Sequence, residues 1–480
     1  MKVNQGEIDS ILERVRGRYG DKNSVAVSPV KSRDPSPALG EGIFSTVDAA
    51  VNAAFAAFHQ YTDLGLERRI SIIEAIREAM RESNAELSKM AHTETGLGRV
   101  SDKIQKNHLV IEKTLGPEDL EPRAVTGDSG MTVTEFAPFG VVAAITPTTN
   151  PTSTIINNTI AILSAGNSVV FNVHPGAKSV SVETVRRMNR GIVAAGGPAE
   201  LVTAIAEPTI ESAQQVMRHP RVRLLMVTGG PAVVREALKT DKRAITAGPG
   251  NPPVVIDESA DIELAAREVV RGASFDNNII CTDEKATLVV ASKAEAFIQA
   301  IGKCPAVVLK EYQIRQVEKV IFDEMGAPGK PGKINPKWIG QNAGRILGEI
   351  GVVAGDEIRL VVAEVPQDHS LVWTEQMMPV MPVVKVRDID EAIDLAVRVE
   401  HGFQHTASIF SNDVGTITRM ARAMNCSIFV ANSANLAGLG YGGEDFTSFS
   451  IATPTGEGLT RPRSFSRIRR LTVVGSLRIV

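Results

Sequence analysis

The chain is poor in aromatic residues, in cysteine and in long apolar runs, and each shortage excludes a class of protein. Only 4% of its 480 residues are aromatic, so the core must be mostly aliphatic, as in parallel β-sheets. The three cysteines, Cys281, Cys304 and Cys426, are too few and too scattered for a disulfide framework or a zinc site. We therefore expect free thiols in a reducing, cytoplasmic setting.

Charge and hydropathy exclude two further classes. The net charge of −3 gives no electrostatic reason to expect a nucleic acid as partner. No stretch reaches the ~20 apolar residues that span a bilayer, and the N-terminus lacks the apolar region of a secretory signal. The 480 residues exceed the ~250–300 at which a single core usually stops growing. We therefore expect two large domains, without a metal site and without a membrane or nucleic-acid partner.

The first forty residues differ from the rest. Residues 1–18 predict an amphipathic helix, because Ile8, Ile11, Leu12 and Val15 recur at helical spacing. Residues 19–40, rich in serine and proline, predict a flexible linker. The helix either packs on its own domain or docks into a groove of a partner, and the long linker favours docking on a partner.

The remaining chain predicts an α/β fold. Helices are expected over Val47–Phe58 and Leu66–Ser83, and a β-hairpin over Ala124–Phe136. Strands and helices then alternate from residue 140 to 227 and again from about 254 to 430, which indicates two parallel sheets. Residues 467–480 read as one or two further strands.

Cys281 is the first candidate for chemistry. It stands just before a β-prone run, after Asn277 and Asn278 and before a charged segment. A structural cysteine normally lies inside an apolar run, a description that fits Cys304 and Cys426 better. Cys281 is therefore a candidate nucleophile, with an inert structural role as the alternative.

Asn150 precedes Pro151 at a strand-to-helix junction. Proline is favourable in the first turn of a helix, so the Asn150 amide lies at the positive end of the helix dipole, where it can donate to a developing oxyanion. An ordinary N-cap asparagine is the alternative.

Thr228, Gly229 and Gly230 lie between a predicted strand and a helix. Glycines at this position let a pyrophosphate approach the helix N-terminus, and a tight turn is the alternative. A formal G-x-G-x-x-G at Gly438, Gly440 and Gly443 has no clear helix after it, and we do not interpret it as a dinucleotide site.

Together with Glu375-Gln-Met-Met-Pro379, these segments resemble the aldehyde dehydrogenase superfamily over residues 43–480. The resemblance implies two Rossmann-like parallel-sheet domains and an oligomerisation β-flap, in a homodimer or tetramer. The implied domains are 41–123 with 138–246 for the cofactor and 247–435 for the catalytic cysteine, with oligomerisation strands at 124–137 and 460–480.

The resemblance also implies roles for these residues. Cys281 would be the nucleophile, Asn150 and the Cys281 N–H would form the oxyanion hole, and Glu375 would hold the nicotinamide ribose. The other residues implied in cofactor binding are Thr146, Pro147, Thr148, Asn172, Thr228, Gly229 and Gly230.

Two departures from the hydrolytic members indicate the CoA-acylating branch. The segment Ala247-Gly-Pro-Gly-Asn-Pro-Pro253 has no carboxylate where those members carry a glutamate base, so hydrolysis of a cysteine thioester should be ~10²–10⁴-fold slower. Asn172 stands where they usually have a lysine, which argues against NADP. The expected reaction turns a small aldehyde (propanal favoured), CoA and NAD⁺ into acyl-CoA and NADH. His401 and His405 are the candidates for deprotonating CoA.

The N-terminal helix and linker resemble the encapsulation peptides of enzymes in bacterial microcompartments, here those of propanediol utilization. This resemblance implies a shell protein as partner and a location inside a microcompartment. Four alternatives remain open: an acetaldehyde-specific CoA-acylating enzyme, an acyl-phosphate reductase on the same fold, a hydrolytic dehydrogenase and a non-catalytic interaction protein.

Overall fold

Residues 39–480 are described by the computed structural model, and two large parallel β-sheets organise them. The first sheet has the strand order β1-β6-β5-β4-β7-β8, with neighbouring strands parallel. Its strands are β1 (Ile43–Phe44), β4 (Val141–Ile145), β5 (Ser168–Asn172), β6 (Val202–Ile205), β7 (Val222–Thr228) and β8 (Arg243–Ala247).

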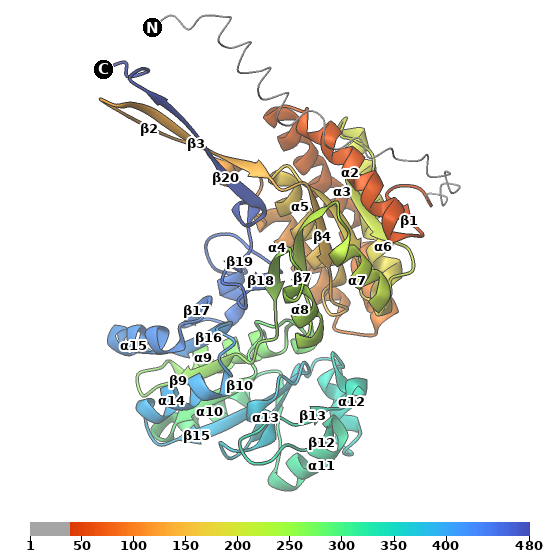
Figure 1. The fold of residues 1–480 in the computed structure, drawn as a ribbon. Helices are drawn as coiled ribbons and strands as arrows, with labels where there is room; N and C mark the ends of the chain where they lie inside the picture. Colours follow the sequence, from red (N-terminus) through yellow and green to blue (C-terminus); the bar gives the residue numbers. More distant parts are fainter. Residues whose placement is uncertain (1–38) are drawn as a thin grey trace, which may run out of the picture. The chain divides into compact units, whose positions relative to one another are not determined.

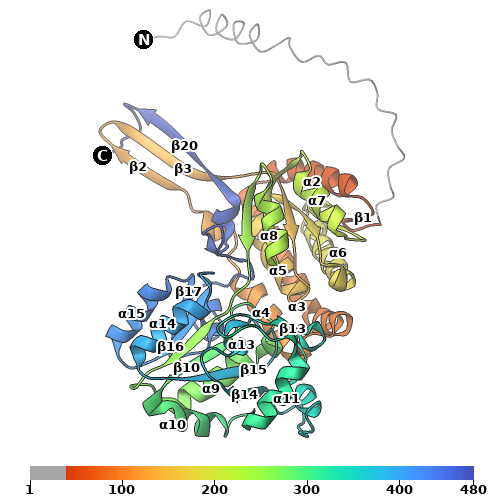
Figure 2. The same ribbon diagram turned by 60° about the horizontal axis from the view of Figure 1, so that its bottom comes forward.

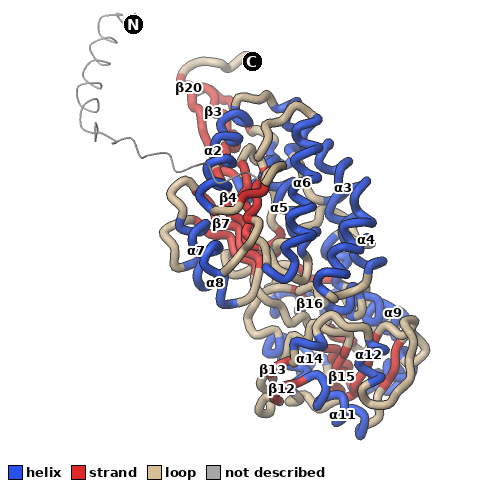
Figure 3. The backbone as a smooth tube through the Cα atoms, turned by 90° about the vertical axis from the view of Figure 1, so that its right-hand side faces the viewer, coloured by secondary structure: helices blue, strands red, loops and turns tan. Residues whose placement is uncertain are grey.

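Helices cover both faces of the first sheet. On β4, Val142 and Ala144 join the core under one set of helices, whereas Val141, Ala143 and Ile145 join the core under the other. This period of two is what a strand buried on both faces requires. Figure 3 shows β4 and β7 between the two sets. One set is α5 (Pro151–Ser164) and α6 (Lys178–Ala194); the other is α2 (Val47–Thr62), α7 (Ile210–Arg218) and α8 (Pro231–Leu238).

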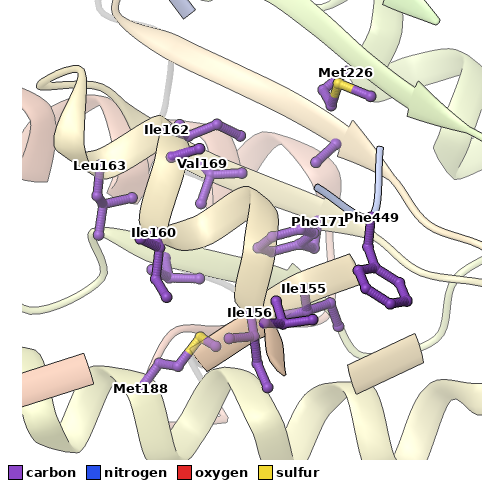
Figure 4. Close-up of a cluster of buried hydrophobic side chains, with 14 of the residues drawn as sticks. Ile155, Ile156, Ile160, Ile162, Leu163, Val169, Phe171, Met188, Met226 and Phe449 are labelled. Carbon is purple, nitrogen blue, oxygen red and sulfur yellow. The ribbon is translucent and has the colours of Figure 1, made fainter. Parts of the chain in front are cut away.

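Helix α5 lies at the centre of this domain, and all of its residues are buried. Helices α3 (Leu66–Thr95) and α4 (Val100–Lys113) pack against it on the side away from the sheet. Figure 4 shows Ile155 and Ile156 beside Phe171 of β5 and Phe449 from the end of the chain. Packing on every side holds the N-terminus of α5, and therefore Asn150, in one place.

The second sheet has the order β11-β14-β15-β10-β9-β16-β17, again with parallel neighbours (Figure 2). Helices α9 (Ile262–Ala273) and α10 (Ala291–Ile301) share a core with one face, and α11 (Glu311–Ile321), α12 (Ala343–Gly348), α13 (Ser370–Trp373), α14 (Ile389–Val399) and α15 (Val414–Met424) share a core with the other. The strands are β9 (Pro253–Ile256), β10 (Ala286–Val290), β11 (Ala306–Val308), β14 (Leu360–Glu364), β15 (Val380–Val386), β16 (Thr406–Phe410) and β17 (Ile428–Ala431).

An antiparallel ribbon consists of β2 (Arg123–Gly127), β3 (Gly130–Pro138) and β20 (Ser466–Val474). Strand β20, near the end of the chain, pairs with β3 from Ser466–Pro138 to Val474–Gly130, and Figure 1 shows the orange and blue strands side by side. Two shorter pairs are β12 (Phe322–Glu324) with β13 (Lys333–Ile334) and β18 (Ile451–Ala452) with β19 (Gly458–Leu459).

The α/β class, the two parallel sheets and the hairpin are confirmed, but α3 is longer than predicted. It continues beyond Ser83 to Thr95. The sequence pattern missed this part because several residues on its buried face are polar. The Asn84 amide donates to the Ile104 carbonyl at 2.9 Å, and the Ser88 hydroxyl donates to Asn84 at 3.1 Å. These hydrogen bonds satisfy side chains whose polarity hides the helical stripe from a hydrophobicity pattern.

The predicted helix at 1–18, and all but the end of the linker at 19–40, lie outside the described residues. Within residues 39–480, every helix is too short or too polar to cross a membrane.

Candidate active site

The first sheet contains a topological switch point. From β4 the chain moves through α5 to β5 and β6 on one side, and then returns to β7 on the other side of β4. In open parallel sheets, ligands bind beyond the carboxyl ends of the strands at such a point. Thr146, Pro147 and Thr148 follow β4, and Gly229 and Gly230 follow β7, so the predicted cofactor segments meet at this edge.

Two of the predicted cofactor residues differ in their available polar groups. The Thr146 hydroxyl is buried and has no hydrogen-bond partner among residues 39–480. Asn172 already uses its amide, which accepts from the Ser212 hydroxyl at 2.5 Å and donates to the Thr209 carbonyl at 3.5 Å. Thr146 therefore offers a free polar group to a ligand, whereas Asn172 holds the start of α7.

Asn150 is the N-cap of α5, and in the described structure its side chain makes no capping hydrogen bond. Its Oδ1 instead accepts a hydrogen bond from Nζ of the buried Lys106 at 2.7 Å. Since the oxygen is engaged, the amide nitrogen, with only the Thr149 hydroxyl at 3.2 Å, remains available as a donor. This is the orientation that an oxyanion ligand needs.

The loop before Cys281 adopts an uncommon backbone. Asp276, Asn277 and Asn278 have φ angles of 43°, 57° and 65°, a left-handed conformation that Asn and Asp adopt more readily than other non-glycine residues. Side-chain contacts hold it: Asp276 accepts the Arg99 N–H at 2.8 Å, and Asn277 donates to Asn342 Oδ1 at 2.8 Å. Such strained backbone persists where surrounding structure holds it, often at functional sites.

The charged residues after Cys281 are buried rather than solvated. Lys285 is 1% exposed, and its ammonium donates to the Asn278 carbonyl at 2.9 Å and the Asn278 side chain at 2.6 Å. Asp283 accepts the Ile280 N–H at 3.1 Å, and burial raises the pKa of the neighbouring Glu284 to about 7. These groups brace the cysteine loop from within, a role that the sequence position at the mouth of β10 did not indicate.

Gly250 connects the distant parts of the site. A β-carbon on Gly250 would lie 2.6 Å from the Cys281 carbonyl oxygen and 3.1 Å from Cγ of His405. The Gly250 N–H points to Glu375 Oε1 at 3.4 Å. The segment 247–253, the cysteine loop, Glu375 and His405 therefore meet around one glycine.

The two candidate histidines lie in different surroundings. His405 is fully buried, and its Nε2 has no hydrogen-bond partner within the described part of the chain. Burial, with a contribution from Lys285, lowers the pKa of His405 to about 4, so its imidazole is neutral at pH 7. His401 is exposed, and its Nε2 contacts the Trp373 carbonyl at 2.8 Å. Of the two, His405 is the one beside the Cys281 loop.

The three thiols are all weak acids in this structure. Burial, together with the Glu375 carboxylate, raises the pKa of Cys281 to about 12 against the opposing effect of the Lys285 ammonium. Burial also raises the pKa of Cys426 to about 11, and it raises the pKa of Cys304. The resting Cys281 is therefore a neutral thiol, so nucleophilic attack requires that ligand binding favours its ionisation.

Three further residues of the site, Lys103, Lys106 and Asp276, were not predicted from the sequence. The ammonium groups of both lysines pair with the buried Asp276 carboxylate, and the lysine side chains are 2% exposed. The only available signal was a polar stripe on α4, where residues 102, 103, 106 and 107 share one face at helical spacing and are all buried. A charged stripe on a helix is usually solvated, so this pattern did not indicate a site.

Two Rossmann-like parallel sheets, a topological switch point and a cysteine loop tied through Lys106 to the Asn150 N-cap are features typical of a nucleotide-dependent enzyme. The chain belongs to the aldehyde dehydrogenase family, which residues 26–306 and 359–447 match.

Its relatives include enzymes with named activities. The chain is 45% identical over 480 residues to the acetaldehyde dehydrogenase (acetylating) EutE of Salmonella typhimurium, and the match covers 100% of each chain. A Rhodopseudomonas palustris propionaldehyde dehydrogenase, solved with bound CoA and an acylated cysteine, is 44% identical with a TM-score of 0.89 over 92% of this chain and 100% of that one. A propionaldehyde dehydrogenase from the Clostridium phytofermentans fucose utilisation bacterial microcompartment is 39% identical, with a TM-score of 0.88 over 92% and 100%.

Proposed function

We propose that this chain is an NAD-dependent, CoA-acylating aldehyde dehydrogenase. It converts a short aldehyde, CoA and NAD⁺ into acyl-CoA, NADH and a proton. The main support is the contact between the Cys281 loop and Gly250, within a segment that carries no carboxylate to activate water. Relatives of matching length and fold carry names of the same chemistry.

In the first half-reaction, Cys281 Sγ as thiolate forms a bond to the aldehyde carbon, and the carbonyl electron pair moves to oxygen. The Asn150 amide and the Cys281 N–H hold this oxyanion, which is their predicted role. When bound, NAD⁺ supplies the two-electron acceptor that turns the thiohemiacetal into a thioester on Cys281.

In the second half-reaction, the CoA sulfur attacks the thioester carbon. The bond to Cys281 Sγ breaks, acyl-CoA leaves and the Cys281 thiolate returns, which is a ping-pong sequence. His405 is the better-placed candidate for taking the CoA proton, since its Nε2 has no partner among residues 39–480 and its ring lies beside the Cys281 loop. His401 is retained as the comparison variant.

The residues that follow β4 and β7 fit a dinucleotide. Thr146 has a buried hydroxyl without a partner among residues 39–480, and Gly230 places its backbone N–H at the start of α8. The Gly229 N–H donates to the Ala247 carbonyl at 3.2 Å, so Gly229 would contribute the close approach of its backbone. Glu375 lies next to Gly250, where a carboxylate can accept the hydroxyls of a ribose. These residues would bind the pyrophosphate and the nicotinamide ribose, with NAD⁺ rather than NADP⁺ expected.

A product assay tests the proposal. The purified chain is given C2 to C4 aldehydes and NAD⁺, with and without CoA, and products are identified by mass spectrometry. Acyl-CoA should form only with CoA, and Cys281→Ala should abolish it. Acyl-CoA formation that survives this substitution would remove the covalent mechanism.

The same assay separates the alternatives. A carboxylate product in CoA-free buffer would indicate a hydrolytic dehydrogenase, and phosphate dependence without CoA an acyl-phosphate reductase. A chain that binds no NAD⁺ would be a non-catalytic interaction protein. We expect propanal to be preferred over acetaldehyde. The ratio of kcat/KM for propanal to kcat/KM for acetaldehyde tests this expectation.

We also propose that the β2-β3-β20 ribbon joins subunits of a dimer or tetramer. Its strands expose apolar side chains, among them Val125, Ile468, Leu471 and Val474, and exposed apolar strands favour association. Light scattering should give a mass of two or four chains. The double variant Ile468→Lys/Leu471→Lys should have a mass closer to that of one chain.

Residues 1–18 are proposed to bind a microcompartment shell protein, which would place the enzyme inside the compartment. The support is the helical apolar stripe in this segment and the microcompartment origin of a similar enzyme. Removing residues 1–18 should abolish co-purification with shells while leaving the specific activity unchanged. Unchanged co-purification would exclude this role.

A further inference from the structure

Asn150 and the Cys281 loop come from different sheets, and one side chain of α4 touches both. Lys106 Nζ donates to Asn150 Oδ1 at 2.7 Å and forms an ion pair with Oδ2 of Asp276. Asp276 lies five residues before Cys281, in the left-handed segment of the loop. The two halves of the predicted oxyanion hole are therefore tied to the same ammonium group.

The contact with Lys106 determines which way the Asn150 amide faces. An ammonium is only a donor, so the amide must present its oxygen to Lys106 and its NH₂ group elsewhere. A flipped amide would place two donors against each other at a site where Lys106 is 2% exposed and Asn150 8% exposed. Water cannot compensate such a mismatch in a buried position.

Charge adds to this orientation. Lys103 Nζ also lies 3.0 Å from Asp276 Oδ2, so two lysines share one carboxylate. Asp102, which lies on the same face of α4 as the two lysines, accepts the Asp276 N–H at 2.9 Å and is paired with Arg359. The cluster behind Asn150 therefore carries excess positive charge, which polarises the amide and makes its N–H a stronger donor.

We propose that Lys106 is a positioning residue for the oxyanion hole: it fixes and polarises the Asn150 amide and holds it in register with the Cys281 loop through Asp276. This inference rests on the proposed function, because it assigns Lys106 to the oxyanion of that reaction. It makes no use of Lys106 as an acid or base.

Lys103 supplies a matched control. Both lysines lie on α4, both are 2% exposed and both pair with Asp276, but only Lys106 touches Asn150. The variants Lys106→Met and Lys103→Met each remove one buried charge and one ion pair. A purely structural role predicts the same effect for the two, whereas the proposal predicts a difference.

The experiment compares the full chain with Lys106→Met, Lys103→Met, Asn150→Ala and the double variant Lys106→Met/Asn150→Ala. Propanal-dependent NADH formation should lose ~10²–10³-fold in kcat in Lys106→Met, with the KM for NAD⁺ unchanged, because a misoriented Asn150 amide no longer donates and losing one oxyanion donor has this effect. The loss in Lys103→Met should stay below ~10-fold, as expected for a site without direct contact to that donor. The double variant should be no slower than Asn150→Ala alone.

A further readout separates the oxyanion from the thiol. Alkylation of Cys281 by iodoacetamide should stay within about twofold of wild type in Lys106→Met, because this reaction needs the thiolate but no oxyanion. Thermal denaturation shows whether Lys106→Met is folded. If it is not, Lys106→Gln, which can still donate one hydrogen bond, replaces it in the same comparison with Asn150→Ala and the double variant.

Equal losses in the two lysine variants, or losses that multiply in the double variant, would overturn the inference. Measuring acyl-CoA formation by the wild type distinguishes a failure of this inference from a failure of the proposed function. If the wild type forms no acyl-CoA, the proposed function itself fails; if it does and Lys106→Met behaves like Lys103→Met, only the role of Lys106 fails.

Discussion

Gly250 lies so close to Cys281 that a β-carbon on it would stand 2.6 Å from the Cys281 carbonyl oxygen. Alanine keeps the Gly250 N–H that points to Glu375, so Gly250→Ala tests the close approach alone. The contact is with backbone, so the cysteine loop must move, and misplacing reacting groups by about 1 Å can cost ~10²-fold in rate. We expect such a loss in kcat by NADH assay. Gly65→Ala, where a β-carbon meets nothing within 4 Å, should retain wild-type activity.

In the variant Glu375→Gln, we expect the Cys281 thiol to become more reactive and turnover to become slower. The Glu375 carboxylate raises the pKa of Cys281, so removing its charge lowers that pKa and increases the thiolate fraction. Iodoacetamide should label Cys281 a few times faster at pH 8, as followed by peptide mass spectrometry. Turnover with NAD⁺ should fall, because the predicted ribose ligand is lost. Slower labelling would show that Glu375 does not act on the thiol.

His405 makes stability depend on acid pH. Its pKa is lowered to about 4 in the folded chain from about 6.5 in the unfolded chain, so the unfolded state takes up the proton first. The associated stability is complete above pH 6.5 and is lost as the pH falls towards 4, by about 3 kcal/mol in total. Glu284, with its raised pKa of about 7, has the opposite effect between pH 7 and 4.5.

The His405 contribution is isolated by comparison with His405→Gln, which does not titrate. The advantage in melting temperature of the wild type over His405→Gln at pH 7 should shrink as the pH falls to 4. A gap that stays constant or widens would contradict a buried neutral imidazole. The same variant at pH 7 should slow transfer of the acyl group to CoA, and His401→Gln should do so much less.

The absence of a carboxylate from segment 247–253 predicts a stable acyl-enzyme. Propanal and NAD⁺ without CoA should give a burst of about one NADH per active site, the kinetic sign of a covalent intermediate. Intact mass spectrometry should then find one propanoyl group, on Cys281, and added CoA should release it. Continuous NADH production without CoA would instead show that water resolves the thioester.

Local pattern and short motifs were sufficient for much of this molecule. Alternating strands and helices predicted the two parallel sheets, since a strand buried on both faces must be apolar throughout. Pro151 marked the start of α5, and with it the place of Asn150 at the helix N-terminus. The segment 247–253 contains no carboxylate, and this absence, which indicated the CoA-acylating branch, can be read directly from the sequence.

The sequence by itself determined the fold class and the family, and it predicted the residues that we propose for the chemistry, because these depend on short segments whose identity is visible in the chain. Only the tertiary structure decided which groups surround them. In the folded chain, Lys106 contacts Asn150 and Glu375 lies beside Gly250. His405, rather than His401, lies next to the cysteine loop. These relationships join residues far apart in the chain, and charge, pKa and hydrogen bonding depend on such neighbours rather than on sequence position.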